Sequence, residues 1–595
     1  MRRCQLSAIQ SRIYSMNETP ELASFLMDAA AGECAAPEAP LDAAPRHGIN
    51  PAVTLLDVTV APPNAIHTDG DAERLIRAIS EANGLIPEIG FAVMTTLQAR
   101  LRAAQWRVTC VIALGDGRQA PRVIDLWPVD PARRAYGLAL DIGSTTLAAY
   151  LCDLMSSEVI ANAKMVNPQV SYGADVMSRV SHSMMYPGAH LQMTAAVRDG
   201  VRRLTAEVTA RCGIEAAEVL DAVVVCNPIM HHLYLGFDPY ELGQAPFTFA
   251  TSKALHVAAR DIDLPIHPLA QAYLLPAVGN HVGADAAAVM LCEDLHCSEA
   301  MTLVIDIGTN AEFFLGNSKD IVASSSPTGP ALEGAEITHG QRAAPGAIER
   351  VRIHPLTKEI RFKVIGSELW SDEPDFEASI RGIGVTGICG SGVIEMVAEM
   401  RMAGLIDPTG RIGTRDETGC AACFADGRTT SVTLYHCKRH IYVTNNDVRE
   451  VQMAKAALYA SLRLLMDDLG VSSVDRIVLA GAFGSHISVK HAMVLGLIPD
   501  CALEHVSAVG NAAGAGACVA LMDVEARRQI ERAVQHVRNV ETATHADFQA
   551  YFLSASDIPN AEDRFPSLAA RVVLPEVAFG KRSGRKNPDR MRGRQ

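Results

Sequence analysis

Long apolar runs and an excess of basic side chains are both missing from this 595-residue sequence. No uninterrupted apolar stretch reaches the roughly 18 to 20 residues that a membrane-spanning helix needs, so we expect no membrane partner. The 53 Lys and Arg against 67 Asp and Glu give a formal net charge of −14, which argues against a nucleic-acid-binding surface. The first fifteen residues also lack the continuous apolar core of a secretory signal. We therefore expect a cytoplasmic protein.

Apolar periodicity is missing at both ends of the chain. Residues 1–50 are rich in Ala, Pro and Glu and predict a disordered leader, within which Met16 is a second candidate start. Residues 576–595 predict a basic, disordered tail. In between, the apolar pattern predicts strands and helices. The strands are expected at 53–62, 106–114 and 122–127, and the helices near 72–81, 91–103 and 189–210.

An apolar strand around an Asp-x-Gly turn occurs twice, as LALDIGSTTLAAY at 138–150 and as LVIDIGTNAEFFL at 303–315. Gly143 and Gly308 lack a Cβ, so backbone N–H groups at each turn can come close to an anion. Hydroxyl and amide donors follow, namely Ser144, Thr145 and Thr146 in the first copy and Thr309 and Asn310 in the second. One such turn is also typical of an Asx turn between two strands. Two copies favour a pair of phosphate-binding turns on the walls of a cleft.

The carboxylates of the two turns indicate a cation. Asp141 and Asp306 would repel a phosphate, so we expect Mg²⁺ with its waters between carboxylate and phosphate. Glu312 follows Asp306 by six positions on the outgoing strand. If strand alternation continues through the turn, both carboxylates share a face, and Glu312 could polarise an attacking water. A structural ion pair is the alternative for Glu312.

Two small-residue segments near the C-terminus complete the pattern, RIVLAGAFGS at 476–485 and VGNAAGAGA at 509–517. With the two turns, they resemble the acetate and sugar kinase, Hsp70 and actin superfamily of ATP-binding proteins. The resemblance implies an α/β fold with two RNase H-like lobes around an ATP cleft, preceded by a small α+β linker domain. It also implies that a Gly-rich turn lies under the adenosine, formed by Gly481, Ala482, Phe483 and Gly484.

Longer strings narrow the resemblance. NPQVSYGADVMSRV at 167–180, SPTGPALEGAEITHGQRAAPGAIERV at 326–351 and GICGSGVIEMVAEMRMAGLID at 387–407 are similar to the reductive activators of corrinoid proteins. That family implies ATP-dependent reduction of cob(II)amide to cob(I)amide on the corrinoid protein of a methyltransferase system. By the same resemblance, we expect a linker domain at 52–130, a first ATPase lobe (middle domain) at 136–298 and a second ATPase lobe (C-terminal domain) at 299–575.

The sequence departs from the family's pattern in its N-terminal cysteines. Members commonly carry an N-terminal [2Fe–2S] domain with C-x4-C-x2-C spacing, but the first fifty residues contain only Cys4 and Cys34. We therefore expect no such cluster here and a separate electron donor, a ferredoxin or a flavoprotein.

A further group of candidate ligands has zinc-ribbon spacing. Cys420 and Cys423 are followed after thirteen residues by Cys437 and His440. The pattern predicts a Zn²⁺ site, or less readily an iron–sulfur site; four unliganded side chains in a variable insertion are the alternative.

Two other functions remain open on the same scaffold. A small-molecule kinase would need a substrate-binding base in the cleft, and a non-catalytic regulator would bind ATP and a methyltransferase without turnover. The sequence leaves the oligomeric state open, a homodimer included.

Overall fold

The structure, a computed structural model, describes residues 49–579 with a few gaps. The gaps are residues 65–67, 116–119, 174, 280, 309, 328–329, 438, 485–486 and 543–544. Residues 1–48 of the predicted leader and 580–595 of the predicted tail lie outside the described residues. Within the described ranges, no helix is long and apolar enough to cross a membrane.

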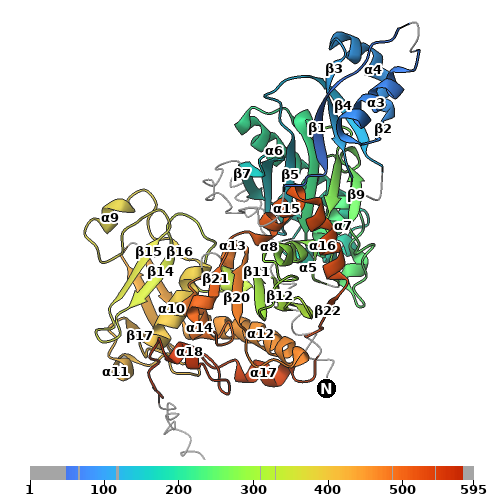
Figure 1. The fold of residues 1–595 in the computed structure, drawn as a ribbon. Coiled ribbons are helices and arrows are strands. Elements are labelled where there is room, and N and C mark those ends of the chain that lie inside the picture. The colour runs from blue at the N-terminus through green and yellow to red at the C-terminus, as the bar shows by residue number, and fades with distance from the viewer. Residues whose placement is uncertain are drawn as a thin grey trace, which may run out of the picture.

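A small four-stranded sheet with two helices forms the first unit, at the end of the molecule far from the second lobe (Figure 1). Its elements are β1 (Val53–Thr59), α3 (Asp71–Asn83), β2 (Glu88–Ile89), α4 (Phe91–Ala103), β3 (Arg107–Ala113) and β4 (Arg122–Pro128). The buried faces of both helices share one core with the sheet. The predicted order of strand, two helices and two strands is confirmed, while the two-residue strand β2 was not expected.

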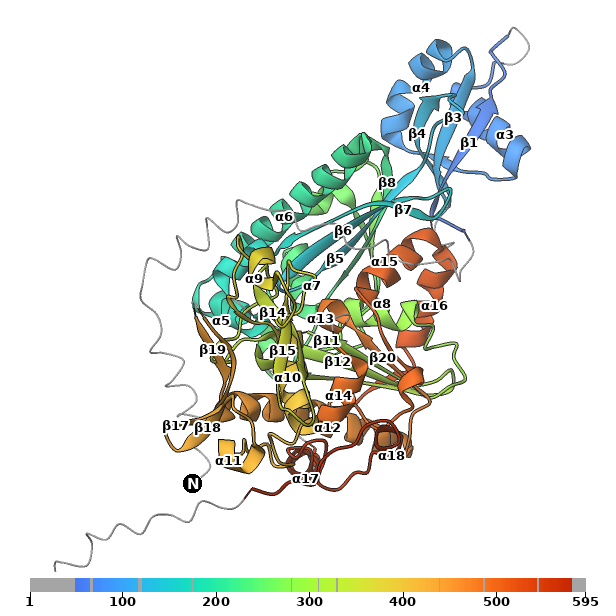
Figure 2. The same ribbon diagram turned by 90° about the vertical axis from the view of Figure 1, so that its left-hand side faces the viewer.

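The first lobe is built on a six-stranded sheet in the order β7-β6-β5-β8-β10-β9. Its strands are β5 (Tyr136–Ile142), β6 (Thr146–Asp153), β7 (Glu158–Val166), β8 (Val219–Cys226), β9 (Leu255–Ala258) and β10 (Gln271–Leu274), and its helices are α5 (Val176–Met185), α6 (Ala189–Cys212), α7 (Pro228–Leu235) and α8 (Ala284–Cys292). Helices α6 and α7 pack on one face of the sheet. Helix α8 covers the other face together with α15 (Ala512–Met522), which arrives from the far end of the sequence (Figure 2).

The second lobe has a six-stranded sheet in the order β21-β20-β11-β12-β13-β22, in which β21 to β13 repeat the arrangement of β10, β8, β5, β6 and β7, while the sixth strand lies at the opposite edge. Its strands are β11 (Thr302–Ile307), β12 (Asn310–Gly316), β13 (Ile321–Pro327), β20 (Arg476–Ala480), β21 (Val506–Ala508) and β22 (Val537–Asn539). In both lobes the Asp-bearing strand pairs antiparallel with the next strand and parallel with a later one. The predicted fold of two RNase H-like lobes is confirmed.

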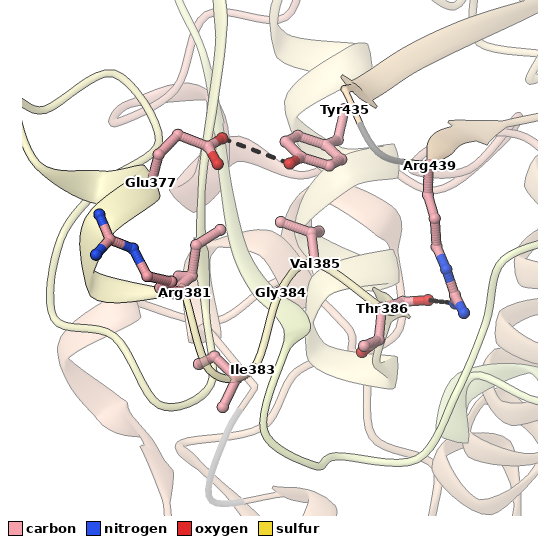
Figure 3. A pocket seen from close by; sticks show the side chains of 9 residues that line it. Glu377, Arg381, Ile383, Gly384, Val385, Thr386, Tyr435 and Arg439 are labelled. Carbon is pink, nitrogen blue, oxygen red and sulfur yellow. Dashed lines mark hydrogen bonds between the residues drawn. The ribbon is translucent and has the colours of Figure 1, made fainter.

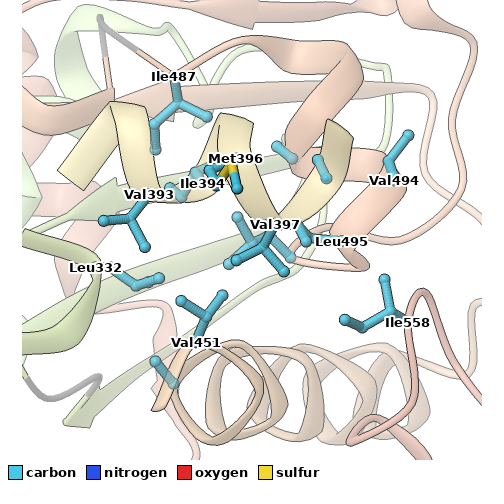
Figure 4. Packing of buried hydrophobic residues seen from close by; sticks show 14 of the residues in the cluster. Leu332, Val393, Ile394, Met396, Val397, Val451, Ile487, Val494, Leu495 and Ile558 are labelled. Carbon is cyan, nitrogen blue, oxygen red and sulfur yellow. The ribbon is translucent and has the colours of Figure 1, made fainter. Parts of the chain in front are cut away.

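Helices cover the outer face of the second sheet, and short strands extend the lobe. The helices of this side are α10 (Gly390–Met402), α12 (Asn445–Leu469), α13 (Gly481–Gly484), α14 (Val489–Leu495), α17 (Phe548–Ser554) and α18 (Pro566–Ala569). Helix α16 (Val524–Val534) packs instead with α8 and α15 in the core between the two sheets. Helix α10 is buried along most of its length, and Val393, Met396 and Val397 lie at the centre of the core (Figure 4). The extension contains β14 (Ala347–Ile353), β15 (Ile360–Val364), α9 (Phe376–Ser379), β16 (Gly387–Ile388), α11 (Arg415–Thr418), β17 (Cys423–Asp426), β18 (Thr429–His436) and β19 (His440–Val443).

Helices α8 and α15 pack against each other between the two sheets and share one core with both. Both are rich in small residues, as ADAAAVMLC and AAGAGACVALM show. A Cβ added to Gly516 on α15 would lie 2.0 Å from the carbonyl oxygen of Ala288 on α8. The backbones therefore approach more closely than any larger side chain at position 516 would allow.

Replacing Gly516 by Ala tests this contact. Alanine favours a helix over glycine by about 1 kcal/mol, but the added methyl meets backbone that cannot move aside without separating the sheets. We expect a net loss of about 1–3 kcal/mol, measured as a lower thermal midpoint. Gly382→Ala is the control, because a Cβ there meets nothing within 4 Å. An unchanged or higher midpoint for Gly516→Ala would refute the argument.

Candidate active site

The first Asp-x-Gly turn has its carbonyl oxygens engaged by the protein. Gly143 N–H donates to the carbonyl of Thr146 at 3.0 Å, and a Cβ on Gly143 would lie 2.7 Å from that oxygen. The carbonyl of Gly143 accepts from Asn167 Nδ2 at 2.8 Å, that of Thr145 from Asn167 N–H at 2.8 Å, and that of Ser144 from Arg179 Nη2 at 2.5 Å. Protein donors thus hold the backbone of the turn in place through its carbonyl oxygens. This assigns a local role to Asn167 and Arg179 of the NPQVSYGADVMSRV segment. The side-chain hydroxyls of the turn are the groups that we expect to bind an anion.

The second turn is one residue shorter than the first, because Ile307 pairs with Ala311 whereas Ile142 pairs with Leu147. Gly308 N–H donates to the carbonyl of Asn310 at 3.0 Å, while Thr309 lies outside the described residues. Asp306 and Glu312 are direct partners across the β11–β12 pair, so their side chains lie on the same face of the sheet. At the corresponding position of the first lobe, Asp141 faces Ala148. The two turns therefore differ, since only the second supplies an additional carboxylate.

Two residues that the sequence did not single out complete the group. Asp285 stands in the first turn of α8, and Asn511 is the N-cap of α15. Asn511 Nδ2 donates to Asp141 Oδ2 at 2.7 Å and to the Tyr150 hydroxyl at 3.2 Å. The sequence does contain a signal for both residues. The segment AVGN occurs at 277–280, before the run of alanines that holds Asp285, and again at 508–511, before α15.

Four carboxylates from both lobes influence one another at this place. Burial is the main cause that raises the pKa of Asp141 to about 7, and Asp285 adds to it. Burial likewise raises the pKa of Asp285 to about 7, and the charge of Asp306 adds to this shift. Burial also raises the pKa of Asp306 to about 7, and the charge of Asp141 adds to it. The pKa of Glu312 is raised well above its ordinary value by burial, then by Asp285 and Asp306. None of these shifts has a contribution from a Lys, Arg or His among the described residues.

This charge distribution fits a hydrated divalent cation. Clustered carboxylates without a basic partner are relieved either by protonation or by a cation. No group of three or more His, Cys, Asp or Glu in the described ranges is arranged to hold a metal ion directly. The residues therefore suit Mg²⁺, which keeps several waters and takes few protein ligands when phosphates are present.

The Gly-rich turn after β20 is a single turn of helix, Gly481–Gly484, not an open loop. Gly481 has a φ of +91°, and its N–H donates to the carbonyl of Gly510 at 3.2 Å. A Cβ on Gly481 would lie 2.5 Å from Asp306 Oδ1. The turn thus touches both the second carboxylate and the segment leading into α15, while the side chains of Ala482 and Phe483 lie outside the described set.

The predicted zinc site is not formed. Cys423 faces Val432 across the β17–β18 pair, whereas His440 faces His436 at the other end of the β18–β19 pair. Val432 and His436 are four residues apart on one strand, or about 13 Å. Cys420 and Cys423 are buried at one end and Cys437 is exposed at the other. The spacing was correct for zinc, but strand pairing separates the two halves, so this prediction was wrong.

Comparisons with known proteins assign the family. Three family models match successive parts of the chain: the RACo linker region at 44–133, the RACo middle region at 136–298, and the C-terminal domain of RACo, the ASKHA domain, at 300–569. The corrinoid activation enzyme RamQ of Eubacterium limosum is 32% identical over 440 residues, which are 72% of this chain and 71% of that protein. The chain belongs to the RACo family.

Other RACo relatives agree with this assignment. A Methanosarcina barkeri protein named [Co(II) methylated amine-specific corrinoid protein] reductase is 25% identical over 398 residues, covering 62% of this chain and 67% of that protein. The solved structure of a reductive activator for corrinoid, iron-sulfur protein superposes with a TM-score of 0.75 at 29% identity, covering 87% of this chain and 81% of that one. The ASKHA domain implies that the cleft binds ATP.

Asp285→Asn tests the carboxylate group. At pH 8 all four carboxylates are largely ionised in the unfolded chain. In the folded chain they repel one another. Removing one of these charges should therefore raise the thermal midpoint measured without Mg²⁺. The same change should weaken Mg²⁺–ATP binding at least about tenfold, or roughly 1.4 kcal/mol. Calorimetry of both variants measures the two effects. The control Asp261→Asn removes an exposed carboxylate of the same lobe and should change neither the thermal midpoint nor the affinity for Mg²⁺–ATP. A lower midpoint for Asp285→Asn would contradict the repulsion.

Gly481→Ala tests the adenosine turn. The methyl would enter the space of Asp306 Oδ1, and a φ of +91° is strained for any residue with a Cβ. We expect ATP binding to fall below detection in equilibrium titration. Gly510→Ala, at the other end of the same backbone hydrogen bond, meets nothing within 4 Å and should bind ATP normally. Equal affinities for the two variants would exclude a role for this contact.

Proposed function

We propose that this protein uses ATP to drive the reductive activation of a corrinoid protein, from cob(II)amide to cob(I)amide, for a methyltransferase system. Membership of the RACo family supports the reaction, and the names of its relatives support a corrinoid protein as partner. The main support for ATP dependence is the cluster of four carboxylates that both lobes contribute beside the Asp-x-Gly turns. A corrinoid protein of a methylated-amine system is the first partner to test, because a relative is named for one.

The proposed roles follow the geometry of the site. The hydroxyls of the two turns hold phosphates, together with backbone N–H groups other than those of Gly143 and Gly308, which donate to carbonyls within the turns. Asp141 and Asp306 hold the waters of Mg²⁺, which when bound would neutralise phosphate charge. Glu312 faces Asp306 across the strand pair and orients the water that attacks the terminal phosphate. Asn511 fixes the orientation of Asp141 through the 2.7 Å hydrogen bond.

Reduction to cob(I)amide is uphill for ordinary donors, and each 59 mV of mismatch in a one-electron couple is a factor of about ten in the equilibrium. ATP can help only if its binding or hydrolysis favours a protein state that contacts the corrinoid partner differently. Closure of two lobes on a nucleotide is such a change of state. The site lies where that closure would act, since its residues come from both sheets and from helices α8 and α15.

The electron is proposed to come from a separate ferredoxin or flavoprotein. The 595 residues contain no C-x4-C-x2-C segment, and the described residues contain no group of cysteines arranged to bind a cluster. The chain thus supplies the nucleotide-driven part of the reaction.

A reconstituted assay tests the proposal. The assay contains wild-type protein, Mg²⁺–ATP, a reduced ferredoxin and the corrinoid protein of a methylated-amine system. The absorption spectrum of cob(II)amide should change to that of cob(I)amide.

Glu312→Gln should bind ATP normally but reduce turnover by about 10²-fold or more. Omitting the ferredoxin should abolish reduction; reduction by the isolated chain with a weak chemical reductant would disprove the need for a donor protein.

The same assay separates the alternatives. ATP hydrolysis stimulated by the corrinoid protein supports the activator. ADP formation that depends on an added small acceptor would indicate a kinase, and ATP binding without turnover under all conditions would indicate a regulator.

A further inference from the structure

A cavity of about 230 Å³ lies in the extension of the second lobe, away from the carboxylate group. Figure 3 shows its walls, which come from α9, from the 383–386 segment and from the β18–β19 hairpin. The ring of Tyr435 forms one wall and packs edge-on against Phe362 at a centroid distance of 6.0 Å. Phe362 in turn contacts Phe376 at 5.8 Å. The cavity is therefore anchored to the core of the lobe.

The lining combines positive charge with an aliphatic floor. Ile380, Ile383 and Val385 supply apolar surface, while the guanidinium groups of Arg381 and Arg439 stand on opposite sides (Figure 3). Arg439 Nη1 donates to the carbonyl of Thr386 at 3.2 Å, which fixes its position.

Charge at the cavity is unbalanced. Among the described residues, neither Arg381 nor Arg439 has a carboxylate within 4 Å. The one acidic side chain of the lining, Glu377, accepts from the Tyr435 hydroxyl at 3.4 Å. Two arginines against one glutamate leave a net charge of +1 at the rim, in a protein of net charge −14. An anionic group would be attracted here and repelled by much of the remaining surface.

Size restricts the occupant. Pockets for drug-sized ligands usually measure about 300–1,000 Å³, so about 230 Å³ is too small for a nucleotide or a corrin ring. The space suits one apolar side chain of a protein, with neighbouring carboxylates on the two arginines. Arg–carboxylate pairs of this kind give orientation as well as affinity.

Helix α10 leads from the cavity to α14, the helix that follows the adenosine turn in the sequence. Thr386 leads directly into β16 and helix α10. On α10, Glu399 Oε1 lies 2.8 Å from His491 Nε2, and His491 Nδ1 lies 2.7 Å from Ser488 Oγ. Ser488 follows the Gly481–Gly484 turn by four residues. Strand β16 and helix α10 therefore lead from the cavity wall to the buried Glu399–His491 contact.

We propose that this cavity docks an acidic segment of the corrinoid protein, which inserts an apolar side chain while its carboxylates pair with Arg381 and Arg439. This inference rests on the proposed function. The corrinoid protein is favoured over the electron donor because relatives of this chain are named for corrinoid proteins, and because helix α10 leads from this cavity to α14, which follows the adenosine turn. An electron donor requires only proximity.

The test uses the full chain and the corrinoid protein as the probe. The double variant Arg381→Glu/Arg439→Glu should weaken binding of the corrinoid protein at least about tenfold and remove the tightening that wild-type binding shows at low salt. Arg381→Lys/Arg439→Lys keeps both charges and should retain the salt dependence with a smaller loss of affinity. Arg122→Glu/Arg571→Glu is the matched control, because both are exposed arginines outside the cavity and the net charge changes by the same amount. All variants should bind Mg²⁺–ATP as wild type does, which shows that they are folded.

Two results would overturn the inference. Binding of the corrinoid protein by the double Glu variant at wild-type affinity would show that the cavity is not its docking site. Loss of ferredoxin binding alone, with corrinoid-protein binding intact, would assign the cavity to the electron donor instead. If wild-type protein neither binds nor reduces the corrinoid protein, the proposed function fails, and this inference fails with it.

Discussion

The close packing of helix α8 against helix α15 is the contact on which the rest of the structure depends. Gly516 lets the two backbones meet at Ala288, and the pair of helices then serves as a common layer for both sheets. The same helices bring functional groups with them, because Asp285 stands in the first turn of α8 and Asn511 caps α15. A change in the angle between the lobes would therefore alter the site directly.

The geometry concentrates negative charge where the lobes meet. Burial raises the pKa values of Asp141, Asp285 and Asp306 to about 7, and the neighbouring carboxylates add to these shifts. In the proposed function, a cation bound with nucleotide would relieve the repulsion among these carboxylates and favour an arrangement in which both turns contact phosphate. A change of state of that kind is what a reductive activator needs to alter its contact with a corrinoid partner.

Much of the architecture was readable from local pattern. The repeated Asp-x-Gly segments predicted two lobes because buried strands and tight turns are encoded over about ten residues. Long-range pairing was harder to infer. The Cys420 and Cys437 halves have zinc spacing, yet the β17–β18–β19 register separates them. Asp285 was not predicted because an acidic residue at the start of a helix is ordinary by itself. Its pKa is raised by burial and then by Asp306, and both depend on tertiary packing.

By itself, the sequence determined the two-lobed α/β fold, the positions of both Asp-x-Gly turns and the resemblance to corrinoid activators, since these depend on contiguous residues and their order. Only the tertiary structure decided which carboxylates share one site, that Asn511 hydrogen-bonds Asp141, and that Arg381 and Arg439 flank one cavity. These pairs are tens to hundreds of residues apart. Their proximity is set by strand order and by helix packing, which no short stretch of sequence specifies.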